Sequence, residues 1–186
     1  AVLGLRHSAC SNNCWLSGRI DEARIYPTAL TACQVQALQP VPQPCPTGAT
    51  EFGGHCYQPY DDRPASGAPF NYWDWAEGQC GARFAGGHLV SIGSPEENTF
   101  VRGFHPNRGI MLGASDATNA ANVFTWFDGT PFAYHPWGTC NGAQQPDNRT
   151  VLRFTSFIPE DYVNLMEDGV WCDVPYADGN PYVCEF

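Results

Sequence analysis

A short polar segment carries the side chains best suited to chemistry. Residues 145–147 are Gln145, Pro146 and Asp147, an amide and a carboxylate on either side of a ring-locked residue. Side-chain oxygens held in this way suit a hard cation or a sugar hydroxyl. The same residue types also build ordinary turns. The triplet by itself therefore leaves two interpretations open, a binding site and a turn.

The histidines do not indicate a catalytic centre. They are dispersed at His7, His55, His88, His105 and His135, and no Ser–His–Asp or Cys–His arrangement is suggested by their neighbours. The carboxylates are better explained as ligands than as acid and base. We therefore predict that the protein is not an enzyme.

Composition restricts the classes of partner. The chain has 186 residues, 43% of them hydrophobic, and a formal net charge of -10, and all nine basic residues are Arg. Because there is no basic run, nucleic acid and anionic membranes are poor partners. There is also no stretch of eighteen apolar residues, so we expect no membrane insertion. The acidic balance is compatible with divalent cations, and equally with a surface that only keeps the protein soluble.

Cysteine usage indicates an oxidising compartment. Nine cysteines are scattered along the chain without the close pairing of a zinc site, which favours disulfides. An odd number leaves at least one thiol free or paired with another chain. The first residues, AVLGLRHSAC, lack a basic leader region, so we expect that a signal segment was removed or never belonged to this chain. We predict a secreted, extracellular protein.

Two helices are predicted to position the polar segment. Trp73, Ala76, Cys80 and Phe84 are three or four residues apart, which predicts an amphipathic helix that ends before Gly86 and Gly87. A second helix is expected to begin after Ser94 as N-cap, with Pro95 in the first turn and Glu97 completing a capping box.

Short β-like runs surround these helices, at residues 88–92, 110–114, 123–127, 162–166, 170–174 and 182–186. Two helices and a set of short strands predict an α+β domain. Residues 115–160 are rich in Gly, Pro and Asn and show little periodicity. Their aromatic residues argue against disorder, so we expect a long functional loop.

Several motifs occur together in a recognisable order. CPTGATEFGGHCY, GGHLVSIGSPEENTFV, QPDN, PEDYVNL and GVWCDVPYADGNPYVCEF follow one another between residues 45 and 186. This segment resembles a C-type lectin-like domain. The resemblance implies an α+β fold with two helices, short antiparallel sheets and a long calcium-binding loop region. It also implies a Ca²⁺ site made by Gln145, Asp147, Glu160 and Asp173, with Pro146 in the cis form.

The same resemblance implies a ligand. Gln-Pro-Asp in this family marks galactose and N-acetylgalactosamine, so the expected function is a secreted, calcium-dependent module for glycans with terminal galactose-type sugars. Phe154 and Phe157 are candidates for stacking on the sugar, although either also suits a core or strand position. The alternative is a structural or protein-interaction subunit with a degenerate sugar site.

The chain departs from the family pattern near this site. Cys172 replaces the usual Asn before Asp173, and Tyr162 and Tyr176 occupy two usual Cys positions. A replacement disulfide Cys140–Cys172 is therefore expected, with Asn148 or Asp161 as additional ligands. The resemblance further implies disulfides Cys45–Cys56 and Cys80–Cys184. A second calcium site would use Asp116 and Asp161, but its customary Glu falls near Ala120.

Residues 1–39 differ from the rest of the chain. LSGRIDEARIYPTALTACQVQAL, at 16–38, resembles the end of a laminin-G or concanavalin-like jelly roll. Forty residues are too few for an independent sandwich. We therefore expect three parts: an arm at 1–39, a Pro-rich linker at 40–44 and the lectin-like domain at 45–186. The arm is either a fragment that folds back or a contact for a homo-oligomer or filament.

Overall fold

The computed structural model describes residues 29–30, 44–64, 71–153, 156–175 and 179–186. The chain divides between Val41 and Pro42, and the fold below is that of the second unit. The predictions for the arm and for residues 40–43 of the linker lie outside the described residues, apart from Ala29 and Leu30. Within the described ranges, no helix is long and apolar enough to cross a membrane.

Helix α2 spans Tyr72–Arg83, as the spacing of its apolar residues predicts. Asn71 caps it, since its side-chain oxygen accepts hydrogen bonds from the amides of Trp73 and Asp74. Trp73, Ala76 and Cys80 are buried on one face. Phe84 lies just beyond the helix in extended conformation and stacks on Phe186, with ring centroids 3.7 Å apart.

Helix α3 spans Pro95–Arg102 and begins after Ser94 as predicted, but the Glu97 side chain accepts from Gly93 and not from the Ser94 amide that a capping box requires. Ser94 Oγ accepts a hydrogen bond from the Glu97 amide at 3.1 Å. The Glu97 carboxylate bonds the amide of Gly93 at 2.8 Å, one residue before the N-cap. This contact places Glu97 against the turn that precedes the helix.

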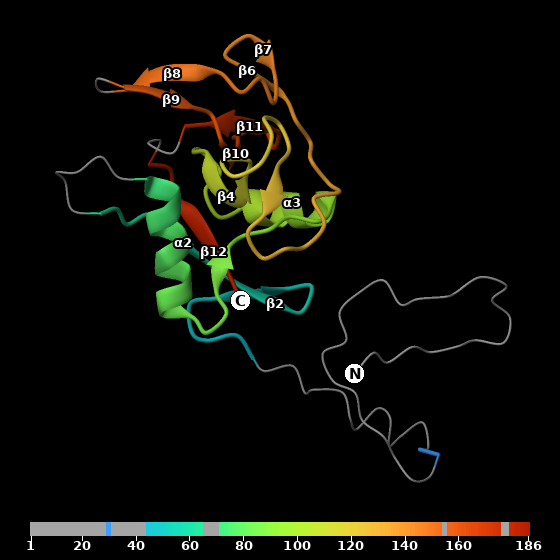
Figure 1. The fold of residues 1–186 in the computed structure, drawn as a ribbon. Helices are drawn as coiled ribbons and strands as arrows, with labels where there is room; N and C mark the ends of the chain where they lie inside the picture. The colour runs from blue at the N-terminus through green and yellow to red at the C-terminus, as the bar shows by residue number, and fades with distance from the viewer. Residues whose placement is uncertain (1–28, 31–43, 65–70, 154–155, 176–178) are drawn as a thin grey trace, which may run out of the picture. The chain divides into compact units, whose positions relative to one another are not determined.

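One sheet of eight strands forms the centre of the domain (Figure 1). Its main path runs β1-β2-β12-β4-β10-β11, while β3 pairs with β12 and β5 pairs with β4. Among the described strand pairs of this sheet, β12 with β4 is the parallel one, and the isolated bridge between Trp137 and Trp171 is also parallel. The strands are β1 (Thr50–Phe52), β2 (His55–Tyr60), β3 (His88–Leu89), β4 (Ile110–Ser115), β5 (Thr125–Trp126), β10 (Tyr162–Leu165), β11 (Trp171–Val174) and β12 (Tyr182–Glu185). Each of the six predicted runs overlaps one of these strands.

The long loop region contains more regular structure than expected. Two hairpins form there: β6 (Thr139–Cys140) with β7 (Ala143–Gln144), and β8 (Thr150–Arg153) with β9 (Ser156–Pro159). Figure 1 shows both hairpins beyond the β10–β11 end of the sheet. The strands are too short for their alternation to stand out in the sequence. The predicted long loop region therefore contains two short hairpins that its sequence did not indicate.

The core lies on both faces of the sheet. One cluster is centred on Trp171, Leu112 and Val163, and the other joins Trp73 and Cys80 of α2 to the sheet. The three predicted disulfides, Cys45–Cys56, Cys80–Cys184 and Cys140–Cys172, are all present. The fold is thus the predicted α+β arrangement with two helices.

Candidate functional site

The outermost strand of the sheet path, β11, supports the site. The preceding loop runs along it, because Trp171 N–H donates to Pro136 O at 2.9 Å and Gly138 N–H donates to Trp171 O at 3.1 Å. The approach at Gly138 is close: a Cβ there would lie 2.3 Å from Val170 Cγ2, so only glycine fits. Gln145 N–H then bonds Gly138 O at 2.9 Å, which brings the predicted triplet beside β11.

The side chain of Gln145 contacts the backbone of Asp173. The Gln145–Pro146 peptide bond is cis, as the resemblance implies. Gln145 is 6% exposed, and its Oε1 accepts a hydrogen bond from the Asp173 amide at 3.2 Å. The Asp173 carboxylate in turn accepts from the amides of Asp147, at 3.3 Å, and Asn148, at 2.6 Å. The loop and the strand therefore hold each other in position.

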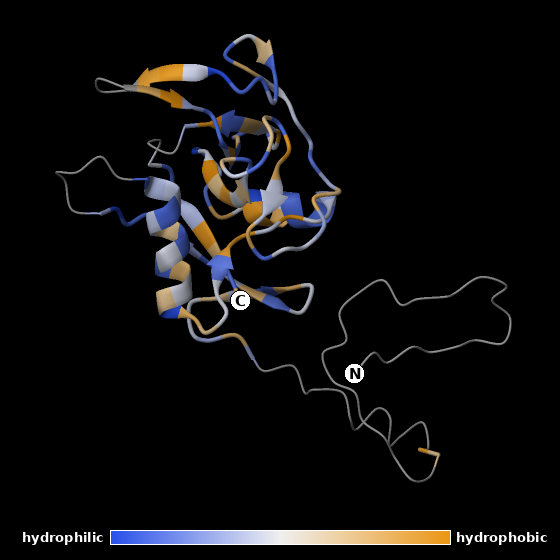
Figure 2. Ribbon diagram, in the orientation of Figure 1, coloured by the Kyte–Doolittle hydropathy of each residue, from blue (hydrophilic) through white to orange (hydrophobic). Residues whose placement is uncertain are grey.

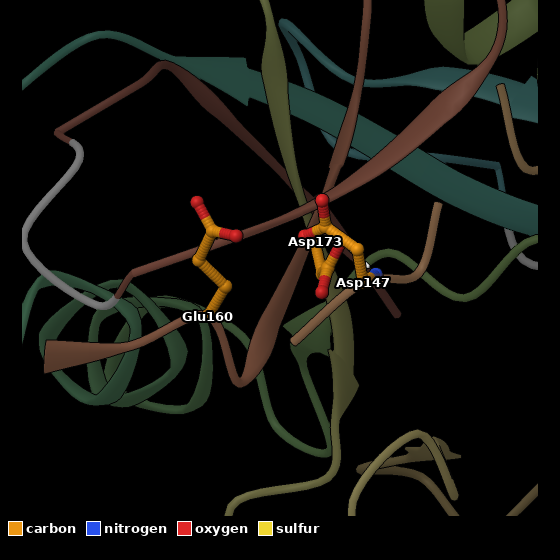
Figure 3. A group of neighbouring side chains, drawn as sticks. All are labelled: Asp147, Glu160 and Asp173. Atoms are coloured by element: carbon orange, nitrogen blue, oxygen red, sulfur yellow. Dashed lines mark hydrogen bonds between the residues drawn. The ribbon is translucent and has the colours of Figure 1, made fainter. Parts of the chain in front are cut away.

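Three carboxylates converge at this point. Asp147, Glu160 and Asp173 each offer an oxygen, and these oxygens all lie within 4.8 Å of one another. Figure 3 shows their carboxyl groups turned toward one another. The amide of Glu160 donates to Arg149 O at 3.0 Å, closing the base of the β8–β9 hairpin. The two ends of one hairpin thus carry Asp147 and Glu160.

The electrostatics of the triad favour a cation. Burial, and then the charges of Asp173 and Asp147, raise the pKa of Glu160 to about 7. Burial also raises the pKa of Asp173, against the opposing effect of the amides that donate to it. Both Asp147 oxygens are buried, Arg149 Nε lies 2.8 Å from Oδ2, and a side-chain contact with Asp147 also contributes to the raised pKa of Glu160. Three clustered carboxylates, one of them ion-paired with Arg149, fit a hard divalent cation such as calcium.

Two other predicted ligands, Asp161 and Asp116, are not among the converging carboxylates. Asp161 lies beside Asp116: the Asp116 amide donates to Asp161 O at 3.0 Å, and burial and then the charge of Asp116 raise the pKa of Asp161. Asp116 Oδ1 is buried without a hydrogen-bond partner among the described residues. Asn148 has a φ of 45° and contributes its backbone amide to Asp173. The structure therefore groups Asp161 with Asp116, apart from the triad.

The structure describes one of the two candidate stacking residues, Phe157. Phe154 lies outside the described residues. Phe157 is 73% exposed on β9, paired across the hairpin with Leu152, which is 59% exposed. Figure 2 shows the hydrophobic colouring on these two strands. The described residues that line the cleft at the triad include Val151 but not Phe157, so stacking by Phe157 stays a prediction.

A cleft of about 840 Å³ contains the triad and extends past it. Several of its lining residues were not predicted from the sequence, among them Asn164 of β10, which is 2% exposed. Its Oδ1 is buried and has no hydrogen-bond partner among the described residues. The available signal was a lone amide inside the apolar run YVNLM. Further lining residues are Cys140, Gln145, Arg149, Met166, Glu167, Asp168, Val170, Cys172, Val174 and Asn180.

Known proteins with the same organisation share both sequence and fold with this chain. No family model matches it. Snaclec 3 of Sistrurus catenatus edwardsii is 31% identical over 153 residues, covering 76% of this chain and 83% of the snaclec. A human scavenger receptor C-type lectin carbohydrate-recognition domain superposes with a TM-score of 0.60 at 26% identity, covering 77% of this chain and 98% of that domain. A calcium-independent type II antifreeze protein gives a TM-score of 0.58 at 27% identity, with coverages of 76% and 93%.

Proposed function

Because this chain belongs to the C-type lectin-like family, we propose that it is a secreted, calcium-dependent carbohydrate-binding module of the galactose and N-acetylgalactosamine type. The observation that carries the proposal is the convergence of Asp147, Glu160 and Asp173 beside Gln145. The family is one of binding domains and not of enzymes. The three disulfides support an extracellular location.

The residues present can supply a calcium coordination sphere. Asp147, Glu160 and Asp173 would provide carboxylate oxygens, and Gln145 would provide its amide oxygen. That oxygen already accepts one hydrogen bond from Asp173, but a carbonyl oxygen has a second lone pair. Bound calcium would supply positive charge and open coordination positions for two sugar hydroxyls. The charge would also offset the repulsion that raises the pKa of Glu160.

The chain's own groups would orient the sugar. The backbone amides of Asp147 and Asn148 hold the Asp173 carboxylate in place, so its remaining lone pairs can accept from hydroxyl donors. Gln145 presents an amide nitrogen in addition to its oxygen, and an amide can donate to a hydroxyl oxygen. The Gln-Pro-Asp order of these groups is the basis for proposing a galactose-type sugar.

A second function remains in competition because of Cys172. This residue lies in a disulfide with Cys140, where the family commonly has a ligating Asn, so one oxygen ligand is lost. A related fold belongs to a protein described as calcium-independent. The alternative is a structural or protein-interaction subunit whose sugar site has decayed.

Calorimetric titration separates the two functions. Calcium is titrated into the chain with and without galactose, and galactose is titrated with calcium and with excess chelator. The proposal requires calcium binding, and galactose binding only in its presence. Galactose binding that persists in chelator would contradict the calcium-dependent site. Absence of calcium binding at millimolar concentration would favour the interaction subunit.

A further inference from the structure

Arg149 carries the one cationic side chain among the described residues that line the cleft. Its Nε lies 2.8 Å from Oδ2 of Asp147, two residues earlier in the chain. Five carboxylates line the same cleft, and those of Asp147, Glu160 and Asp173 place oxygens within 4.8 Å of one another. Within the described part of the cleft, the guanidinium of Arg149 is thus the only full positive charge that the chain supplies to the triad.

This charge offsets only part of the repulsion within the triad. Asp173 accepts hydrogen bonds from the backbone amides of Asp147 and Asn148, which carry partial charges and no full positive charge. At Glu160, burial and then the charges of Asp173 and Asp147 still raise the pKa to about 7. Because the repulsion remains while Arg149 is in place, the triad still attracts a cation of higher charge than a guanidinium.

The position of Arg149 allows its side chain to leave the triad. The Arg149 side chain is 55% exposed, whereas that of Asp147 is 16% exposed. The backbone of Arg149 is fixed at the base of the β8–β9 hairpin, because its carbonyl accepts from the Glu160 amide at 3.0 Å. Rotation of the side-chain torsions alone therefore moves the guanidinium into solvent, while the carboxylates stay in place. An ion pair with one exposed partner contributes little stability, so its exchange for a stronger contact costs little.

We propose that Arg149 is a tethered counter-ion of the triad, which pairs with Asp147 in the calcium-free protein and is displaced from it by calcium. The inference rests on the proposed function and concerns the regulation of that same site. Because the guanidinium is attached two residues from Asp147, its effective concentration there is on the order of millimolar. A monovalent ion brings no more charge than the guanidinium, whereas a divalent ion does. Arg149 therefore selects divalent cations and sets the calcium concentration at which the site fills.

The first test measures calcium affinity by calorimetry on the full chain, without sugar, at pH 8, above the pKa of about 7 of Glu160. Arg149→Gln should bind calcium about fivefold more tightly than the wild-type chain, since no ion pair has to be broken. Arg63→Gln is the matched control, because Arg63 also follows an aspartate, Asp61, by two residues, is half-exposed and does not line the cleft. It should leave the affinity unchanged. Equal or weaker binding by Arg149→Gln would overturn the proposal.

NMR spectroscopy of the wild-type chain follows Arg149 directly, so the proposal is decided even if the variant does not fold. In chelator, the Arg149 side-chain protons should show nuclear Overhauser contacts with the β protons of Asp147. Saturating calcium should remove these contacts. Contacts that persist with calcium bound would show that the ion and the guanidinium share Asp147, and they would overturn the displacement.

The selection of divalent cations has a test of its own. Calcium affinity is compared in sodium chloride and in choline chloride of equal ionic strength, so that screening is the same in both. The wild-type chain should bind calcium equally in the two salts, because sodium does not displace Arg149. Arg149→Gln should bind calcium more weakly in sodium chloride, because sodium then has access to Asp147. Equal sensitivity of the two proteins to sodium would contradict the selection.

Failure of this inference and failure of the proposed function give different results. If calcium binds and galactose binding depends on it, but Arg149→Gln binds calcium no more tightly, the role of Arg149 alone is wrong. If neither the wild-type chain nor Arg149→Gln binds calcium at millimolar concentration, the proposed function is wrong and this inference falls with it.

Discussion

The indole of Trp171 donates a hydrogen bond of 2.8 Å to Asn98 Oδ1, joining β11 to helix α3. Asn98 also donates to Gly169 O at 2.9 Å, at the turn that leads into the strand. Trp171 is fully buried, and Trp126, Tyr134 and Trp137 pack edge-on against it. The strand that carries Asp173 is therefore fixed by a polar contact inside an aromatic cluster.

Replacing Asn98 should destabilise the domain. Asn98→Ala leaves the buried Trp171 Nε1–H without an acceptor, which costs about 1–3 kcal/mol in free energy of unfolding. Denaturant unfolding would measure the loss. Thr99→Ala, at an exposed position on the same helix, serves as the control. Equal effects of the two substitutions would show that the buried contact has no special weight.

Removing a triad carboxylate should abolish calcium binding without unfolding the protein. Because loss of a supporting residue costs about 10–100-fold in metal affinity, loss of a direct ligand in Asp147→Asn or Asp173→Asn should weaken binding by at least about 100-fold. Asp74→Asn, at an exposed carboxylate on α2, should leave calcium affinity unchanged. Calorimetry measures the affinity, and circular dichroism checks the fold. Unchanged affinity in both triad variants would place the ion elsewhere.

Calcium affinity should fall as the pH falls through about 7. The pKa of Glu160 is raised to about 7, so below that pH the ion must displace a proton, and apparent affinity should drop by up to about tenfold per pH unit. Glu160→Gln should remove this dependence while binding more weakly throughout. A flat profile between pH 5.5 and 8 in the unmodified chain would contradict the assignment.

The same group should affect the stability of the calcium-free protein with the opposite sign. A pKa raised in the folded state favours the protonated folded form, so the stabilisation is fully present below the unfolded pKa near 4.5 and is lost as pH rises through about 7. Melting temperatures in chelator should therefore decrease from pH 5 to 8 more than those of Glu160→Gln. Identical slopes for the two proteins would show that Glu160 is not the cause.

The Cys140–Cys172 disulfide should stabilise both the fold and the site. It links two cysteines that are 32 residues apart in the sequence. On the chain-entropy model, a loop of this length corresponds to a stabilisation of about 3–4 kcal/mol in the free energy of unfolding. Replacing both cysteines by serine should lower the free energy of unfolding by that order and weaken calcium binding, because β6 is no longer tied to the strand of Asp173. Calcium affinity is compared well below both melting temperatures. An unaltered calcium affinity would show that the hydrogen bonds along β11 hold the site in place without the disulfide.

The two helices and six strands of the main sheet were predictable from local signals, whereas β1 and β2 lie outside the predicted runs. Ser94 with Pro95 and the spacing of Trp73, Ala76 and Cys80 specify the helices, since caps and burial act within a few residues. The ligand set came from the family resemblance, because neighbouring residues alone do not show that Asp147 and Glu160 meet at the two ends of one hairpin. The position of Asn164 at the cleft depends on the pairing of β10 with β11, and the sequence of one strand alone does not determine that pairing.

Self-association through residues 1–39 stays a prediction, because the arm lies outside the described residues apart from Ala29 and Leu30. If the arm joins copies, the full chain should form oligomers or filaments, and a chain beginning at Pro44 should be a monomer. Light scattering on both proteins measures their oligomeric states and decides whether the arm joins copies. Two monomers of equal stability would identify the arm as a dispensable fragment.

The carboxylates around the cleft also have a kinetic consequence. Five acidic side chains and one arginine line this concave surface, on a chain of formal net charge -10. Such a surface concentrates the field and raises the local concentration of cations, so calcium should arrive faster than uniform diffusion allows. The association rate should then fall steeply with ionic strength, while dissociation, which depends on the ligands in contact, should respond much less. Calcium association should therefore be fast at low ionic strength and slow at high ionic strength.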